Sequence, residues 1–388
     1  MHGRAVLTAL LAGALRRWGR EHPARHAAAV LVLVLVLAVR FLAAVASPEP
    51  IEDERVYFAA FELAGRGESP YQLSYFYTPT LALLGAWALE HLGEPWLLAA
   101  LRFSNLLGTA VIAWCALAWM PWTWRRRLLV AALYVCLAPA VRMGVLWGNL
   151  SLAAIGLLTL GLFLWRSRPI LAGALLAASV IVKPVGPVAV LLLMAHRPSE
   201  AGRRHLVAGG MALILAAGLL LPMPYFEDML SLDDGRPPPW RSVALHHVLY
   251  CFGLELRFSL VAAVIAAASV FVARRRRLGP ARFYCFAASA TLLATPMVWN
   301  HTMLLALPLQ ALALAVAHAR NEARLADSGT GRRYEAVGVV LLVLAIQLCG
   351  AMGGVMTWPP LLQGVIKALP CLAPAVLTVY LFRSTDPF

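Results

Sequence analysis

Long, nearly uncharged apolar runs restrict the fold of this chain more than any other feature of its sequence. The run at 26–46 contains one Lys or Arg, Arg40, and no acid. A stretch of roughly 20 apolar residues is what an α-helix needs to cross a bilayer. Only 13% of the 388 residues are charged and 61% are apolar, whereas about 25% are charged in a typical soluble domain. We therefore expect an all-α polytopic membrane protein, not a soluble enzyme, a disordered chain or a secreted disulfide scaffold.

The apolar runs predict a bundle of about twelve transmembrane helices in a single integral membrane domain, 1–388. Outside the bundle we expect a cytosolic N-terminal segment at 1–25, a first outer loop at 47–95 with interfacial helices, and a second outer loop at 223–256. The predicted crossings are 26–46, 96–119, 128–144, 149–165, 169–182, 184–195, 206–222, 257–273, 281–298, 301–318, 336–356 and 361–382.

The basic residues predict the orientation of the chain. The net charge is +14, and arginines gather in short segments such as 1–25, 125–127, 274–282 and 320–333. Because short cytoplasmic loops carry an excess of Lys and Arg, we expect these segments and both termini in the cytosol. The acids of the two long loops then lie on the outer face of the cytoplasmic membrane. The positive charge is thus a topology signal, and we expect the lipid bilayer and no nucleic acid as a partner.

Two stretches allow more than one interpretation. Residues 79–92 are apolar but short, so we place them as a re-entrant or interfacial helix; a crossing there would put the arginines of 125–127 outside. The run 169–195 contains Lys183 followed by Pro184, and it is either one crossing or two short helices that turn near Lys183. We prefer two helices, because this arrangement keeps the next basic segment in the cytosol.

Ionisable side chains at membrane depth are the first candidates for a functional site, because they are costly there. By the expected topology, Arg142, Lys183 and His301 all lie at outer ends of helices, and we expect them to share one site. The alternative is three unrelated side chains that extend toward the membrane surface. Arg102 could pair with an acid of the outer face, and Lys367 could extend to the surface. The six cysteines lie in or beside apolar runs without a Cys-x-x-Cys pair, so we expect buried thiols.

The first outer loop supplies the candidate acid. From Asp53 to about residue 65, apolar residues recur at helical spacing, which predicts an amphipathic helix. Asp53 would stand at or near the N-cap of this helix, and capping alone would explain its presence. Tyr71 and Tyr77 follow among prolines, either as interfacial aromatic residues or as the lining of a groove for a sugar or a lipid.

Four motifs in order span residues 50–310. They are Asp53-x-x-Val56-Tyr57 with Gly67-x-x-Pro70-Tyr71 and Tyr77-x-Pro79; Gly148-Asn149-x-Ser151; Ala172-Gly173 with Lys183-Pro184; and Thr295-Pro296-x-x-Trp299-Asn300-His301. In their residues and spacing they resemble glycosyltransferase family 87. The chain departs from the family at Asn149, where Gln is usual, at Asn300, where an acid or His is common, and at Trp240-Arg241-Ser242, where the family often has Asn-Gln-Ser.

The resemblance implies a glycosyltransferase of the C type (GT-C), an all-helical membrane enzyme. Its donor would be a polyprenyl-phosphate sugar instead of a nucleotide sugar. Members of the family transfer mannose or arabinofuranose to glycolipids on the outer side of the cytoplasmic membrane. The resemblance therefore implies a hexosyltransferase, with mannosyl as the first candidate, and a glycolipid or glycan acceptor. It implies no metal and no cofactor.

The candidate residues fit such a transfer. Lys183, Arg142 and His301 could bind the donor phosphate and stabilise the charge that grows on it as it departs. Asp53 is the candidate general base for the acceptor hydroxyl, and the adjacent Glu52 and Glu54 remain alternatives. The candidate substrate-binding residues are Tyr57, Tyr71, Tyr77, Asn149, Trp299 and Asn300.

Two other classes of function compete with this hypothesis. A polytopic lipid or solute transporter or flippase would use the helix interruption at Lys183-Pro184 and the buried cations. Two observations count against this class. The sequence has no recognisable pair of inverted repeats, and its polar residues are expected at one face of the membrane instead of the midplane. A non-catalytic membrane scaffold would not explain why acids and cations converge.

Overall fold

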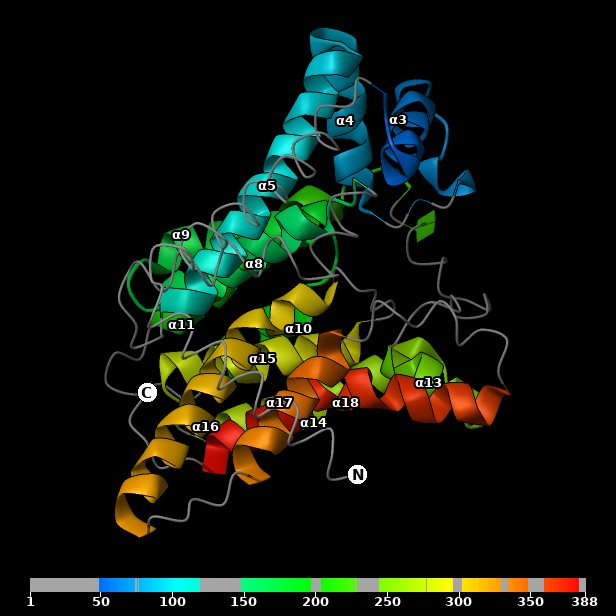
Figure 1. The fold of residues 1–388 in the computed structure, drawn as a ribbon. Coiled ribbons are helices and arrows are strands. Elements are labelled where there is room, and N and C mark those ends of the chain that lie inside the picture. The colour runs from blue at the N-terminus through cyan, green and yellow to red at the C-terminus, as the bar shows by residue number, and fades with distance from the viewer. Residues whose placement is uncertain are drawn as a thin grey trace, which may run out of the picture. The chain divides into compact units, whose positions relative to one another are not determined.

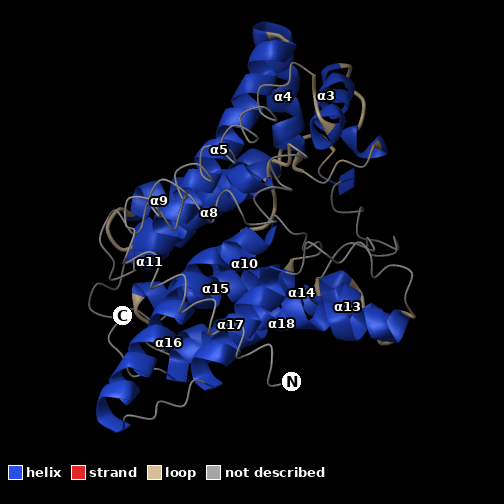
Figure 2. Cartoon of the chain, in the orientation of Figure 1, coloured by secondary structure: helices blue, strands red, loops and turns tan. Residues whose placement is uncertain are grey.

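The structure is a computed structural model that describes residues 49–73, 75, 77–118, 148–196, 204–225, 227–228, 244–276, 278–295, 302–328, 334–347 and 359–383. All of these residues belong to one compact unit, Pro48–Phe388. Within these ranges the regular secondary structure is helical throughout (Figure 2), which confirms the all-α prediction. The expected cytosolic segment 1–25 and the predicted crossings 26–46 and 128–144 lie outside the described residues.

The helices follow the apolar runs of the sequence closely (Figure 1). They are α3 (Glu52–Gly65), η1 (Pro70–Gln72), α4 (Pro79–Leu92), α5 (Glu94–Ala118), α8 (Ser151–Leu164), α9 (Pro169–Val182), α10 (Pro187–Ala195), α11 (Arg204–Leu220), α13 (Leu245–Cys251), α14 (Phe258–Arg275), α15 (Pro280–Ala294), η2 (Thr302–Ala306), α16 (Leu307–Ser328), α17 (Tyr334–Gln347) and α18 (Pro360–Arg383).

The described helices have the character of a membrane protein. Three of them, α5, α14 and α18, are long and apolar enough to cross a membrane, and α8, α9 and parts of α11, α16 and α17 are apolar but shorter. On α14, large apolar side chains such as Leu260, Val264 and Phe271 stay more than half exposed, as on a helix whose surroundings are lipid. The cysteines that the structure describes, Cys115, Cys251, Cys285 and Cys371, are free and buried, as expected.

The region 47–95 and the interrupted run 169–195 contain helices where the sequence predicts them. Helix α4 starts at Pro79, and the hydroxyl oxygen of Thr78 accepts the backbone N–H of Leu81, so both residues favour a helix start there. Helices α9 and α10 are separate, with a break at 183–186. Lys183 has an extended backbone, φ −151° and ψ 132°, because a residue that precedes proline is disfavoured in the helical region.

Some helix ends differ from the predicted crossings. Helix α16 continues to Ser328, although the crossing was expected to end at 318. The extension contains Arg320, Glu322 and Arg324, which are good helix formers, so a helix that leaves the apolar region continues without interruption. Helix α10 begins at Pro187 and not at 184, because Pro184 belongs to the break.

Helices α5, α8, α9 and α11 pack as neighbours, α5 on α8, α8 on α9 and α9 on α11, and they lie side by side in Figure 1. Glycines allow the closest approach between α5 and α8. A Cβ at Gly108 would lie 2.3 Å from the carbonyl oxygen of Leu152, and one at Gly156 would lie 2.5 Å from the Cα of Gly108. Small residues at a helix crossing let backbones approach closely, which is how helices associate in membranes.

We expect Gly108→Ala to destabilise the protein by about 1–3 kcal/mol, because the added methyl group would force α5 away from α8. Gly210→Ala is the matched control: Gly210 is also inside a helix, α11, but a Cβ added there would meet no atom within 4 Å. That change should be neutral or stabilising by about 0.5–1 kcal/mol. Thermal unfolding in one detergent compares the two variants, and equal effects would contradict the close crossing.

Candidate active site

The site begins with a buried ion pair at the start of α3. Glu54 is fully buried, and its carboxylate accepts hydrogen bonds from Arg102 of α5: Nε donates to Oε1 at 2.9 Å and Nη2 to Oε2 at 2.8 Å. The backbone N–H of Ile51 also donates to Oε2, at 2.9 Å. Arg102 further donates to the carbonyl oxygen of Glu49, at 2.9 Å. This bidentate pair joins the first turn of α3 to α5. The N-cap of α3 is Ile51, whose N–H Glu54 accepts, so Asp53 lies near the N-cap but does not occupy it.

The chain enters α8 directly against this ion pair. Gly148 has a positive φ of 67°, and a Cβ there would lie 2.4 Å from the Cγ of Glu54. Glycine is therefore required at this position for both the backbone conformation and the space. The turn places the next residue, Asn149, beside the first turn of α3.

Asn149 donates a hydrogen bond to the carboxylate of Asp53, the residue before Glu54. Its Nδ2 donates to Oδ2 of Asp53 at 2.7 Å. Its Oδ1 accepts the backbone N–H of Ser151 and the hydroxyl of Tyr77, both at 2.9 Å. Asn149 is 4% exposed, so these hydrogen bonds form in a largely water-free environment. Asp53 is thus the acid that faces the start of α8, while Glu54 is engaged with Arg102.

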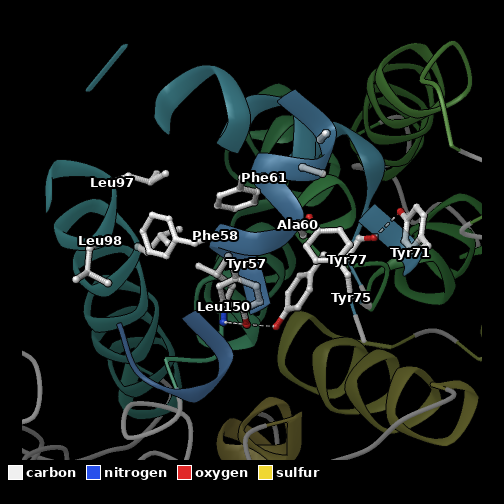
Figure 3. Close-up of a cluster of buried hydrophobic side chains, with 13 residues drawn as sticks. Tyr57, Phe58, Ala60, Phe61, Tyr71, Tyr75, Tyr77, Leu97, Leu98 and Leu150 are labelled. Atoms are coloured by element: carbon white, nitrogen blue, oxygen red, sulfur yellow. Dashed lines mark hydrogen bonds between the residues drawn. The ribbon is translucent and has the colours of Figure 1, made fainter. Parts of the chain in front are cut away.

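Buried tyrosines from the first loop lie beside Leu150, the residue that follows Asn149 (Figure 3). The hydroxyl oxygens of Tyr57 and Tyr77 lie 2.6 Å apart, and the backbone N–H of Leu150 donates to that of Tyr57 at 3.1 Å. The hydroxyl of Tyr71 donates to the carbonyl oxygen of Tyr77 at 2.7 Å. Burial raises the pKa of Tyr57 and Tyr77, and the nearby Asp53 raises both further, so both hydroxyls stay protonated.

Lys183 reaches the same place from the break between α9 and α10. Its Nζ donates to the hydroxyl oxygen of Ser151 at 2.5 Å and lies 5.0 Å from the centre of the Tyr77 ring. The hydroxyl of Thr78 donates to the carbonyl oxygen of Ile181, which ties the start of α4 to the end of α9. Burial of the ammonium group lowers the pKa of Lys183 to about 8, and the attraction of Asp53 opposes this shift.

The structure therefore brings together five of the candidates named from the sequence: Asp53, Tyr57, Tyr77, Asn149 and Lys183. Tyr71 touches this group through the backbone of Tyr77. The other candidates fall outside the described residues: Arg142, His301, Trp299 and Asn300.

Two features of the site were not assigned from the sequence. Ser151 stands in the Gly148-Asn149-x-Ser151 motif, and this was the signal that could have placed it beside Lys183. The choice among Glu52, Asp53 and Glu54 had no local signal, because it depends on Arg102, 48 positions after Glu54. The expectation that Arg102 pairs with an acid is confirmed by this contact; the outer face stays a prediction.

The second lysine of the described residues lies elsewhere. Lys367 of α18 is fully buried, with its Nζ 3.1 Å from Nε2 of His247 of α13. The expectation that its side chain extends to the surface is therefore wrong, because α13 packs over this part of α18.

When compared with known protein families, with curated proteins and with solved structures, the chain matches none of them. The resemblance to glycosyltransferase family 87 therefore depends on the four motifs alone. A function has to be argued from the chemistry of the site.

We expect Arg102→Met to destabilise the protein by about 3–5 kcal/mol, because it leaves the charge of Glu54 buried without a partner. The control is Arg66→Met, which breaks the exposed pair of Arg66 and Glu68 and should change the stability by less than about 1 kcal/mol. Both are measured by unfolding in detergent. Adding Glu54→Leu to Arg102→Met should restore part of the loss. Similar losses in the two single variants would contradict the importance of this pair.

Proposed function

We propose that this protein is an integral membrane glycosyltransferase of GT-C type, with about twelve transmembrane helices. It would transfer a hexosyl unit, first of all mannosyl, from a polyprenyl-phosphate sugar to a glycolipid or glycan acceptor at the outer face of the cytoplasmic membrane. The observation that supports this proposal best is the meeting of Asp53 and Lys183 at the start of α8. Asp53 is bound through Asn149 and Lys183 through Ser151.

This pair has the two groups that a single displacement needs. The acceptor hydroxyl oxygen would attack the anomeric carbon of the donor sugar, and the bond from that carbon to the phosphate oxygen would break. The hydroxyl proton would pass to the carboxylate of Asp53 as the general base. The electron pair of the broken bond would leave with the polyprenyl phosphate, whose added negative charge the ammonium group of Lys183 would stabilise. One base suffices for this displacement.

The contacts also favour Asp53 over Glu54 as the base. A base has to accept a proton from a substrate, and both carboxylate oxygens of Glu54 already accept hydrogen bonds from Arg102. Glu54 is also fully buried and lies against Gly148. Asp53 instead accepts a hydrogen bond from Asn149, and Lys183 attracts Asp53 electrostatically.

A transporter or flippase is the second candidate. Two observations favour it: the helix run is interrupted at 183–186, and the apolar helix α18 contains the fully buried Lys367. The transferase proposal ranks first because it uses the acid and the cation of one site together, and because the four motifs resemble those of a transferase family.

We expect Asp53→Asn to abolish sugar transfer while expression and unfolding temperature stay unchanged, because the amide cannot accept the acceptor's proton. The assay supplies radiolabelled polyprenyl-phosphate mannose, then the arabinofuranose donor, to membranes that contain the protein, and follows label into glycolipid. Glu52→Gln is the comparison variant. Loss in Glu52→Gln with transfer retained in Asp53→Asn would move the base to Glu52. Movement of lipid without transfer by the wild type would favour the flippase.

We expect Lys183→Met to weaken binding of a fluorescent polyprenyl phosphate by about 10- to 100-fold, the effect of losing a hydrogen bond to a charged group. Only the ammonium form attracts phosphate, so wild-type binding should weaken as the pH rises through about 8. Lys183→Arg should remove this pH dependence, because Arg stays protonated.

The control for this measurement is Lys367→Met, which removes the other lysine of the described residues. It should leave the phosphate affinity within about twofold, since Lys367 belongs to α18 and pairs with His247 of α13. Equal loss of affinity in the two variants would remove Lys183 from the phosphate site.

A further inference from the structure

We propose that Tyr77 is a positioning residue that links the acid of the site, Asp53, with its cation, Lys183. Its hydroxyl, acting through Asn149, would orient the carboxylate of Asp53, and its ring would face Lys183. This inference deepens the proposed function, because it concerns the residue assigned as the base. It differs from the substrate-binding role that the sequence analysis gave Tyr77.

Two backbone N–H groups determine the direction of the hydrogen bonds. A backbone N–H can only donate, so the Asn149 side-chain atom that faces the N–H of Ser151 must be the oxygen, Oδ1. The amide nitrogen then faces Asp53 and donates to it. Tyr77 must donate to the same Oδ1, which leaves its hydroxyl oxygen to accept from Tyr57.

The start of this chain of hydrogen bonds is also determined. The N–H of Leu150 donates to the hydroxyl oxygen of Tyr57, and Tyr57 donates to Tyr77. Every hydrogen bond in this chain therefore points the same way, from the backbone N–H of Leu150 at one end to the carboxylate of Asp53 at the other. Because Tyr57 and Tyr77 are 2% and 5% exposed, water competes little for these bonds.

Removing the hydroxyl of Tyr77 should change the hydrogen bond that Asp53 accepts. With Phe at position 77, Oδ1 of Asn149 would lose one of its two donors and Tyr57 would lose its acceptor. The amide could then turn, and Asp53 would lose part of a hydrogen bond that favours its ionised form. The ring would remain, so the contact with Lys183 at 5.0 Å should persist.

Several titratable groups lie near Asp53. Tyr57, Tyr77 and Lys183 interact with it electrostatically. Glu52 and Glu54 are both adjacent in the chain, and the charge of Glu54 is compensated by Arg102. Tyr77→Phe leaves both the charge of Lys183 and the ion pair in place, so a change in the titration of Asp53 would report on the hydrogen bonds.

The test measures the protonation of Asp53 without needing sugar transfer. Dicyclohexylcarbodiimide labels protonated carboxyl groups, and mass spectrometry of the full-length protein after digestion gives the extent of labelling at Asp53 against pH. Tyr77→Phe should move the midpoint of this curve up by about one pH unit, the effect of losing part of a hydrogen bond to a charged group.

Tyr75→Phe is the matched control. Tyr75 is fully buried, lies two positions away, and donates to the carbonyl oxygen of Thr78 at 3.3 Å instead of to Asn149. It should leave the midpoint unchanged. Equal shifts in the two variants, or no shift in Tyr77→Phe, would overturn the inference.

A second pair of variants separates positioning from a general structural effect. If Tyr77 acts through Asn149, Tyr77→Phe should add no further shift once Asn149→Leu is present. Additive shifts would mean that Tyr77 reaches Asp53 by another route and would overturn the inference.

Transfer kinetics then test the link to the proposed function. Tyr77→Phe should lower kcat about tenfold or more and leave the KM for the donor within about twofold, because the ring still faces Lys183. If the wild type transfers no sugar but the labelling midpoint still moves, the proposed function fails while the orientation of Asp53 by Tyr77 stands. If transfer occurs and the midpoint does not move, the function stands and this inference fails.

Discussion

The ion pair of Glu54 and Arg102 is the interaction on which the site depends, because it joins α3 to α5 at the point where the chain turns into α8. Buried pairs of this kind contribute little net stability, since both charges lose their hydration. Their effect is to exclude other arrangements, because any shift of α3 along α5 would leave a buried charge without a partner. The pair also lies against Gly148, so the position of α3 and the direction of the next turn are set together.

The start of α8 then connects segments that are far apart in the sequence. Asp53 and Tyr57 come from α3, Tyr77 from the turn before α4, and Lys183 from the break after α9, and each makes or shares a hydrogen bond with residues 149–151. Asp53 and Lys183 are each bound through a neutral group. Asp53 therefore attracts Lys183 electrostatically while the ammonium group of Lys183 is hydrogen-bonded to Ser151.

Much of the fold could be predicted from the sequence, because apolar runs and prolines act locally. Pro79 and Pro187 begin helices, and Lys183 before Pro184 ends one. The choice of the acid could not be predicted in this way. Three acids stand in a row at 52–54, and which of them is withdrawn from the site is decided by Arg102 on another helix. The place of Ser151 in the site could not be predicted for the same reason, since its partner Lys183 is 32 positions away. The candidates at 142 and 299–301 stay predictions.

Asn149 differs from the pattern of glycosyltransferase family 87, which the motifs of this chain resemble, and it fits this site. The carbonyl oxygen of an Asn side chain reaches the backbone N–H two residues later, and here Oδ1 accepts the N–H of Ser151, the first residue of α8. The same amide donates to Asp53. Gln, which is usual at this position of the family, is one methylene longer and does not close this short ring as readily. In this chain one side chain therefore both satisfies the start of α8 and orients the acid, so the position of the acid is tied to the backbone of the helix.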